Sequence, residues 1–202
     1  RPELTGRQID PEDIQSHLPP GSARNAVEYA LWKLSGRIDD LPASPSYIKT
    51  AQTVPLAEIG EMIQMAKRSK SPILKIKLGD KNDLALLKAV SDTCPEKQII
   101  VDANEGWDMQ TFSNVLPVIQ RCNVRMVEQP LPANSDHDLA SFESPLSIFA
   151  DESVHTSKDL EGLVGKYDGV NIKLDKTGGL TEALKLKEKA LKLGFDVMIG
   201  CM

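Results

Sequence analysis

A charged residue stands at the end of one short apolar run after another in this chain, at a nearly constant interval. Spaced 22 to 26 positions apart, these residues are Lys77, Asp102, Glu128, Asp151 and Lys173. An interval of this length holds one strand and one helix with their connections, so its repetition predicts successive βα units and a parallel sheet. The chain is therefore expected to have an α/β fold.

The apolar runs and the stretches between them can be assigned to strands and helices. Strands are predicted at 47–54, 73–78, 98–103, 124–128, 147–151, 169–174 and 196–201. Helices are predicted between them at 56–69, 81–92, 108–121, 136–142, 157–165 and 179–193. Several strands are apolar almost throughout, which is typical of parallel strands covered on both faces.

Parallel strands of this kind fit either a closed barrel or an open, doubly wound sheet. In a barrel the carboxyl ends of all strands converge on one mouth, where the active site lies. An open sheet binds ligands mainly at one switch point and does not need a charge on five strands. No glycine-rich nucleotide-binding loop follows the first strands. The pattern therefore favours a TIM-type (β/α) barrel.

The beginning of the chain differs in character from the rest. Residues 1–22 are polar and rich in proline, and a helix capped by Ser22 is predicted over 23–35, followed by a linker rich in proline and serine. We therefore expect residues 1–46 to form a region separate from a barrel over 47–202. The chain stops directly on its last predicted strand, so we expect it to be part of a longer protein.

The composition argues against several classes of function. The 202 residues carry a formal net charge of −5 without long blocks of one sign, which disfavours nucleic acid and anionic membranes as partners. No apolar run approaches the roughly 20 residues of a membrane span. Three scattered cysteines fit neither a disulfide framework nor a zinc cluster and suit a reducing compartment. We expect a cytoplasmic protein, for which a homo-oligomer is possible.

Two lysines share one face of the second predicted strand. Because strand residues alternate sides, Lys75 and Lys77 point one way and their apolar neighbours the other. Each ammonium makes its neighbour easier to deprotonate, which is useful where a lysine acts as a base near neutral pH. Taken alone, the pair also fits a solvated edge strand that carries lysines against aggregation.

Three acidic residues follow three consecutive apolar strands. Asp102, Glu128 and Asp151 would repel one another at a barrel mouth, and a hard divalent cation would relieve that repulsion. Ligands that are all oxygen atoms indicate Mg²⁺. For any one of the acids, a helix cap or a pairing with lysine is the alternative. Asn104 lies on the same face as Asp102, two residues further on.

Lys173 ends a later apolar strand and shares a face with Asn171 and Asp175. In an eight-stranded barrel, Lys173 would lie roughly opposite Lys77. A cation between two lysines suits removal of a proton from one face of a carbon and its return to the other. That carbon would be next to a carboxylate, so the predicted partner is a small molecule that carries a carboxylate.

Several segments, in this order and spacing, resemble the muconate-lactonizing subgroup of the enolase superfamily. They are Lys75-Ile76-Lys77, Val101-Asp102-Ala103-Asn104, Val127-Glu128-Gln129-Pro130, Ala150-Asp151-Glu152-Ser153 and Asn171-Ile172-Lys173. Within that subgroup, Asn171 to Leu184 and Ile199-Gly200-Cys201-Met202 look most like dipeptide epimerases of the L-Ala-D/L-Glu type. The resemblance covers nearly the whole chain.

The resemblance implies a modified (β/α)7β barrel with a separate capping domain. Residues 1–46 would be the C-terminal part of the capping region and the helix leading into the barrel. Residues 47–202 would be barrel strands one to seven. The N-terminal capping strands and the last barrel strand of the family are absent from this sequence.

The resemblance also implies roles for matching positions. Asp102, Glu128 and Asp151 would be the Mg²⁺ ligands, and Lys77 and Lys173 the two acid/base lysines.

Further positions are carried over as supporting or substrate-binding residues. Lys75 would tune Lys77, and Asn104 would support the site. The implied substrate contacts are Thr53, Asp175, Cys201 and Met202. For Cys201, buried packing is an equal alternative.

The resulting prediction is that the protein is a Mg²⁺-dependent isomerase, an epimerase acting on dipeptides of the L-Ala-D/L-Glu type. It would use two-lysine 1,1-proton transfer at the α-carbon through a metal-stabilised enediolate. One alternative keeps the barrel and metal but acts as a muconate cycloisomerase or an o-succinylbenzoate synthase. Another is a catalytically silent barrel that binds a ligand.

Overall fold

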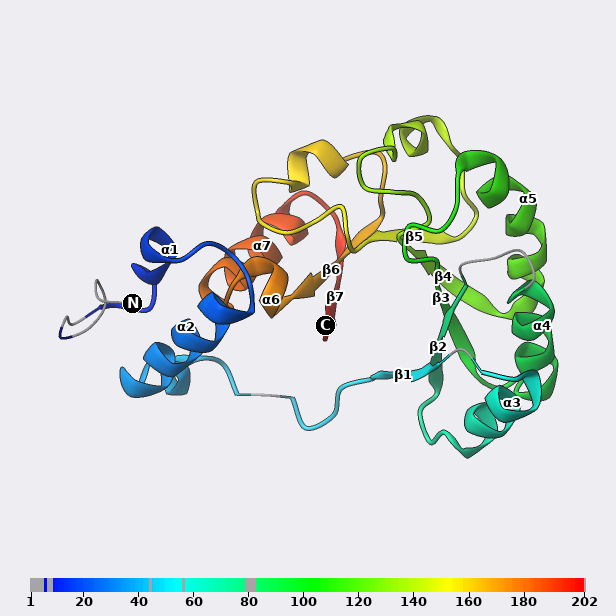
Figure 1. Cartoon of the computed structure of the whole chain (residues 1–202), viewed down its shortest axis with the longest axis horizontal. Helices are drawn as coiled ribbons and strands as arrows, with labels where there is room; N and C mark the ends of the chain where they lie inside the picture. Colours follow the sequence, from blue (N-terminus) through cyan, green and yellow to red (C-terminus); the bar gives the residue numbers. More distant parts are fainter. Residues whose placement is uncertain (1–5, 7–8, 44, 56, 79–82, 202) are drawn as a thin grey trace. The chain divides into compact units, whose positions relative to one another are not determined.

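The computed structural model describes residues 6, 9–43, 45–55, 57–78 and 83–201 (Figure 1). The chain forms two compact units. Unit 1 comprises Arg1–Ser46, Val154–Gly162 and Val170–Met202, and unit 2 comprises Tyr47–Ser153 and Leu163–Gly169. One division falls between residues 46 and 47, where the sequence suggested a boundary. Unit 1 also contains segments that were assigned to the barrel, and the two-domain assignment stays a prediction.

Unit 2 is built on parallel strands that neighbour one another in the order in which they occur in the chain. They are β1 (Ala51–Val54), β2 (Ile73–Lys77), β3 (Gln98–Asp102), β4 (Val124–Glu128) and β5 (Ser147–Ala150). This sequential order is that of a (β/α) barrel, since a doubly wound sheet reverses its strand order.

Helices connect the first four of these strands. They are α3 (Ile59–Arg68), α4 (Asp83–Thr93) and α5 (Met109–Ile119). Figure 1 shows these helices side by side along one face of the strands, and α4 contacts both of its neighbours. Asp108 caps α5, because its carboxylate accepts a hydrogen bond from the Thr111 backbone N–H at 2.7 Å.

The core of unit 2 lies between strands and helices. Leu74 and Ile76 of β2 and Val101 of β3 are fully buried, and so are Phe112 and Ile119 of α5. Burial of such a side chain contributes about 1.5 to 3 kcal/mol each. The continuous apolar runs therefore form a core that holds the strand ends in fixed positions.

In the described part of the chain, three 3₁₀-helices lie between successive strands. They are η2 (Gln120–Cys122), η3 (His137–Ser141) and η4 (Leu160–Leu163). The helices expected at 136–142 and 157–165 are thus single 3₁₀ turns, because each segment is too short to repay the cost of nucleating an α-helix. The strand expected at 47–54 begins only at Ala51, since Tyr47 and Ile48 are exposed.

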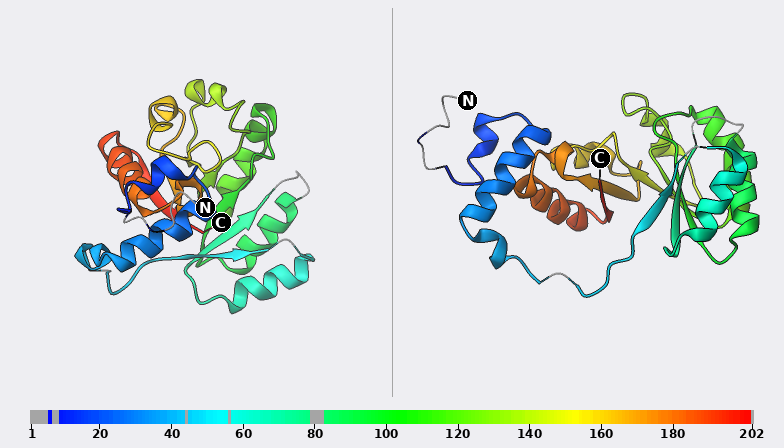
Figure 2. Two further views of the ribbon diagram at one scale, coloured as in Figure 1. Left: turned by 60° about the vertical axis from the view of Figure 1, so that its left-hand side comes forward. Right: turned by 60° about the horizontal axis from the view of Figure 1, so that its bottom comes forward.

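Unit 1 joins the start of the chain to its end. Its elements are α1 (Ile14–His17), α2 (Ser22–Leu34), η1 (Arg37–Asp40), α6 (Leu174–Thr177), α7 (Leu180–Lys192), β7 (Asp196–Gly200) and β6 (Gly169–Lys173), whose first residue belongs to unit 2. Helix α2 packs against α6 and α7 (Figure 2).

Polar side chains of α2 hold the turn between α6 and α7. Arg24 donates hydrogen bonds to the carbonyls of Thr177 and Gly178, and the Glu28 carboxylate accepts from the Thr181 N–H at 2.6 Å. The N-cap of α2 is Gly21 rather than Ser22, whose hydroxyl instead reaches α6. The helix expected over 23–35 is confirmed.

The fold class expected from the sequence is confirmed in unit 2 by parallel strands in sequential order with intervening helices. In the part of the chain that the structure describes, no helix is both long and apolar enough to cross a membrane.

Candidate metal and acid–base site

The charged strand ends of unit 2 stand level with one another. In the strand register Lys77 is opposite Asp102, and Asp102 is opposite Glu128. Asp151 comes directly after β5, one strand further along. The carboxyl ends of β2 to β5 thus bring these four residues to one edge of the parallel strands, as the repeating pattern predicted.

The three carboxylates at this edge are buried. Asp102 is 2% exposed, Glu128 is fully buried and Asp151 is 1% exposed. A buried carboxylate is costly unless a positive charge or several hydrogen-bond donors compensate it. The surroundings of these acids therefore have to supply positive charge or hydrogen-bond donors.

Lys75 supplies one positive charge. Its Nζ lies 2.9 Å from Oδ2 of Asp102 and 2.8 Å from Oε2 of Glu128. Burial lowers the pKa of Lys75, but the opposing effects of Glu128 and Asp102 are together larger and hold this pKa above its usual value. Lys75 is thus a permanent cation at the carboxylates.

The two lysines of β2 lie on one face, as expected, since Leu74 and Ile76 between them are buried. Lys77 is exposed at the strand end, where a small molecule can reach it. The proposed effect of Lys75 on Lys77 stays a prediction.

The loop after β3 is strained next to the carboxylates. Asn104 and Glu105 have left-handed backbone angles (φ 44° and 63°), which cost free energy for residues other than glycine. The Asn104 N–H donates to Oδ1 of Asp102 at 3.1 Å, and its side-chain amide donates to Glu152 at 3.3 Å. Burial and the nearby Asp151 raise the pKa of Glu152. Asn104 thus contacts Asp102 and Glu152, and its supporting role in the site stays a prediction.

The donor set fits a hard cation in its chemistry. All three acids are buried, and the side chains of Asp102 and Glu128 converge on one ammonium group. Among the described residues, no three His, Cys, Asp or Glu side chains already form a group that could hold a metal ion. The Asp102, Glu128 and Asp151 ligand set stays a prediction.

Lys173 ends β6 in unit 1 and is half-buried. Asp175, two residues further on, accepts hydrogen bonds from the Ser22 hydroxyl at 3.0 Å and the Asn25 amide at 2.6 Å. Its carboxylate thus ties α6 to α2, and its role as a substrate contact stays a prediction. So does the placement of Lys77 and Lys173 on opposite sides of a substrate.

The other predicted substrate contacts are spread over both units. Thr53 is exposed on β1 in unit 2, and Cys201 is exposed after β7 in unit 1. Met202 lies outside the described residues.

A largely buried polar cluster next to the carboxylates was not predicted from the sequence. It consists of Gln129, Asp136, Ser153, Lys166 and Tyr167, which are joined by hydrogen bonds. The one available signal was a glutamine directly after a strand-end glutamate. The Ser153 hydroxyl contacts Gln129, Asp136 and Tyr167.

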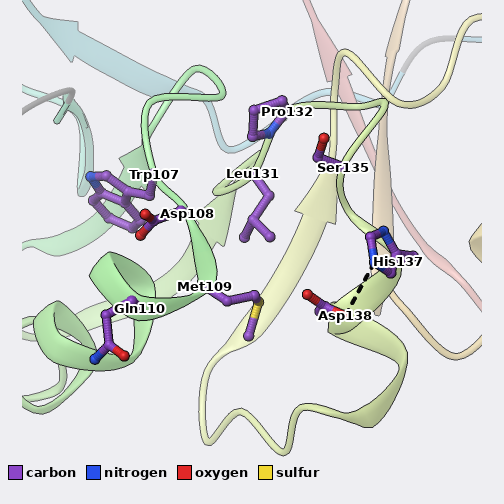
Figure 3. A pocket seen from close by; sticks show the side chains of 9 residues that line it. All are labelled: Trp107, Asp108, Met109, Gln110, Leu131, Pro132, Ser135, His137 and Asp138. Carbon is purple, nitrogen blue, oxygen red and sulfur yellow. Dashed lines mark ion pairs between the residues drawn. The ribbon is translucent and has the colours of Figure 1, made fainter.

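A pocket of about 490 Å³ lies between the start of α5 and η3 (Figure 3). Trp107 at its edge stacks on Phe112 with ring centroids 5.8 Å apart. On the opposite wall, the His137 ring pairs with the neighbouring Asp138 carboxylate at 3.3 Å. None of the carboxylates at the strand ends lines this pocket.

Comparison with known proteins identifies the family. Residues 58–202 match the family described as Enolase C-terminal domain-like. The match covers well over half of the chain, which therefore belongs to this family. The resemblance to the enolase superfamily and its TIM-type barrel is thereby confirmed.

Individual relatives are more specific. An N-acetyl-D-glutamate racemase from Pseudoalteromonas sp. is 40% identical over 203 residues, covering 97% of this chain and 64% of the relative. The L-Ala-D/L-Glu epimerase of Escherichia coli (strain K12) is 42% identical over 201 residues, covering 95% of this chain and 63% of the epimerase. The chain thus spans slightly less than two thirds of the length of these relatives.

Solved structures with a similar fold belong to the same group of proteins as these relatives. An enolase family member from Agrobacterium tumefaciens with homology to dipeptide epimerases, with bound sodium and L-Ala-L-Glu, has a TM-score of 0.88 at 46% identity, covering 96% of this chain and 62% of that one. A dipeptide epimerase from Methylococcus capsulatus, complexed with Mg and L-Arg-D-Lys, has a TM-score of 0.87 at 27% identity, covering 95% and 59%.

Proposed function

We propose that the complete protein is a Mg²⁺-dependent epimerase that acts on dipeptides of the L-Ala-D/L-Glu type. The observation that carries the proposal is the convergence of Asp102 and Glu128, both buried, at the ends of neighbouring strands. A relative that is 42% identical is an L-Ala-D/L-Glu epimerase, which supports the same substrate class for this chain.

Asp102, Glu128 and Asp151 would hold the cation. The chemistry that Mg²⁺ supplies in such a site is stabilisation of the negative charge that develops on the substrate carboxylate. Lys75 keeps its own positive charge beside two of these acids and balances part of their charge.

Lys77 and Lys173 would move the protons. The neutral amine of one lysine takes the proton from the α-carbon, and the electron pair of the broken C–H bond is held at the adjacent carboxylate. The ammonium of the other lysine then donates a proton to the opposite face of the same carbon. The net result is inversion at that carbon with no change in composition.

A second candidate function is racemisation of an N-acylated glutamate. The relative from Pseudoalteromonas sp. is 40% identical over 97% of this chain and is an N-acetyl-D-glutamate racemase. Both substrates are glutamates acylated on nitrogen. They differ because the alanyl group carries an ammonium and the acetyl group does not.

Exchange of the substrate α-proton for deuterium in ²H₂O, compared between the two substrates, distinguishes these functions. We expect the complete protein with Mg²⁺ to replace the α-proton of the glutamyl residue of L-Ala-L-Glu with deuterium and to form the D-glutamyl isomer, as followed by NMR. Chelation of the metal should stop both processes. Faster reaction of N-acetylglutamate would favour the racemase.

Absence of exchange and inversion with both substrates would refute both functions. The cycloisomerase or o-succinylbenzoate synthase reactions would then be the ones to assay. The cytoplasmic location and a homo-oligomeric state are further proposals. The free Cys94 and Cys122, both buried, agree with a reducing compartment.

A further inference from the structure

The Gln129 side chain uses both ends of its amide behind the carboxylates. Its Oε1 accepts hydrogen bonds from the backbone N–H groups of Asp151 at 2.8 Å and Ser153 at 3.1 Å. Its Nε2 donates to the Leu131 carbonyl at 2.8 Å, the Ser153 hydroxyl at 2.8 Å and the Tyr167 hydroxyl at 3.1 Å. One fully buried side chain thus links the end of β4 to the turn after β5.

The backbone of Gln129 is also constrained. Its N–H donates to the Phe149 carbonyl at 2.8 Å, and its φ of 37° lies in the left-handed region. Such an angle costs free energy for a residue other than glycine and persists only where the surroundings enforce it. Gln129 directly follows Glu128, so the position of Gln129 governs that of Glu128 as well.

A second layer of polar groups fixes the direction of the Gln129 amide. Oδ2 of Asp136 accepts from the hydroxyls of Ser153 and Tyr167, each at 2.8 Å. When both hydroxyls donate to Asp136, their oxygens are left as acceptors for Nε2 of Gln129. Lys166 pairs with the other Asp136 oxygen at 2.7 Å and compensates its charge.

Asp136 therefore sets the direction of the Gln129 amide through the hydroxyls of Ser153 and Tyr167. With Nε2 directed to the hydroxyls, Oε1 is left facing the N–H groups of the Asp151 turn. A reversed amide would place NH₂ against two N–H donors, which is unfavourable. A glutamate at this position would have no donor for the Leu131 carbonyl.

We propose that Gln129 is the positioning residue of the cation site and that Asp136, through Ser153 and Tyr167, sets its orientation. Gln129 fixes the distance between Asp151 and Glu128. These are two of the three acids assigned to the cation. This inference rests on the proposed function, because it assumes that these acids bind a cation. Residues that orient metal ligands typically contribute 10- to 100-fold to metal affinity.

The test is titration of the complete protein with Mn²⁺, a spectroscopic probe for a Mg²⁺ site, followed by EPR and calorimetry. Gln129→Ala should weaken Mn²⁺ binding by roughly 10- to 100-fold, and Tyr167→Phe should weaken it less but change the EPR line shape. Matched controls are Gln110→Ala and Tyr29→Phe, which make the same changes at exposed positions.

Loss of stability alone must be separated from loss of positioning. Val115→Ala creates a cavity in the buried face of α5 and should lower the unfolding temperature while leaving the Mn²⁺ affinity unchanged. Equal weakening of Mn²⁺ binding in Val115→Ala would overturn the inference. So would unchanged affinity in both Gln129→Ala and Tyr167→Phe.

The same titrations distinguish failure of the proposed function from failure of the positioning role. If wild-type protein binds no Mn²⁺, the cation site and the inference are both lost. If wild-type protein binds Mn²⁺ and Asp102→Asn weakens binding while Gln129→Ala does not, the cation site stands and only the positioning role is lost.

Discussion

The ammonium of Lys75 lies 2.8 Å from the fully buried carboxylate of Glu128 and links it to Asp102. The partners come from three neighbouring strands, so this ammonium joins the ends of β2, β3 and β4. Removal of one partner from a buried ion pair leaves a charge without compensation and costs more than the pair itself contributes. Lys75 is thus a structural cation as well as a neighbour of Lys77.

Lys75→Met should lower the free energy of unfolding by about 3 to 5 kcal/mol, because two buried carboxylates lose their ammonium partner. Urea unfolding of the metal-free protein measures this loss, and Mg²⁺ should recover part of it. Lys88→Met is the matched control, since the Lys88–Asp92 pair is exposed and such pairs contribute less than about 1 kcal/mol. Similar stability of the two variants would contradict the structural role.

The strand ends could be predicted from the sequence because each depends on local pattern. An apolar run followed by Asp102 or Glu128 is visible in a few residues, and sequential βα units leave little choice of strand order. The structure confirmed both. Pairing with a lysine was considered as an alternative for each acid, but Lys75 could not be identified as the partner of Asp102 and Glu128. The alternation of a strand gives the face of a side chain but not its partner across the sheet.

Contacts between distant segments could not be predicted. The partners of Asp175 are Ser22 and Asn25, 153 and 150 residues earlier in the chain. The cluster around Gln129 likewise draws Tyr167 from 38 residues away. No periodic pattern marks such residues, because each is selected by the space that the assembled strands leave.

Stability should depend on pH through Asp136. Burial tends to raise its pKa, but hydrogen bonds from Lys166, Ser153 and Tyr167 together outweigh burial and hold the pKa below its ordinary value of 3.8. A lowered pKa in the folded state gives stability that is present above the ordinary value and is lost as the pH falls through the folded value.

Asp136→Asn should therefore unfold more easily than wild type at pH 7, with a smaller difference at pH 3. Urea unfolding at both pH values measures this difference. Asp138→Asn, an exposed neighbour, is the matched control. A deficit of Asp136→Asn that is the same at both pH values would show that its charge is not what stabilises the cluster.

Lys77→Ala and Lys173→Ala should each reduce epimerisation by about 100- to 10,000-fold, the usual contribution of a general acid or base. The complete protein with Mg²⁺ and L-Ala-L-Glu is the system to assay. Lys187→Ala, on the exposed face of α7, should retain wild-type activity. Full activity in either of the first two variants would rule out the two-lysine mechanism.

Gly178→Ala should destabilise the protein more than Gly194→Ala. Both glycines have left-handed backbone angles (φ 71° and 86°), so alanine brings strain of about 1 kcal/mol or more at each. A Cβ at Gly178 would also collide with the guanidinium of Arg24, whereas nothing lies within 4 Å of a Cβ at Gly194. The difference between the two free energies of unfolding thus measures how tightly α2 holds the turn after Lys173. Equal losses would show that Arg24 moves aside and that α2 does not fix this turn.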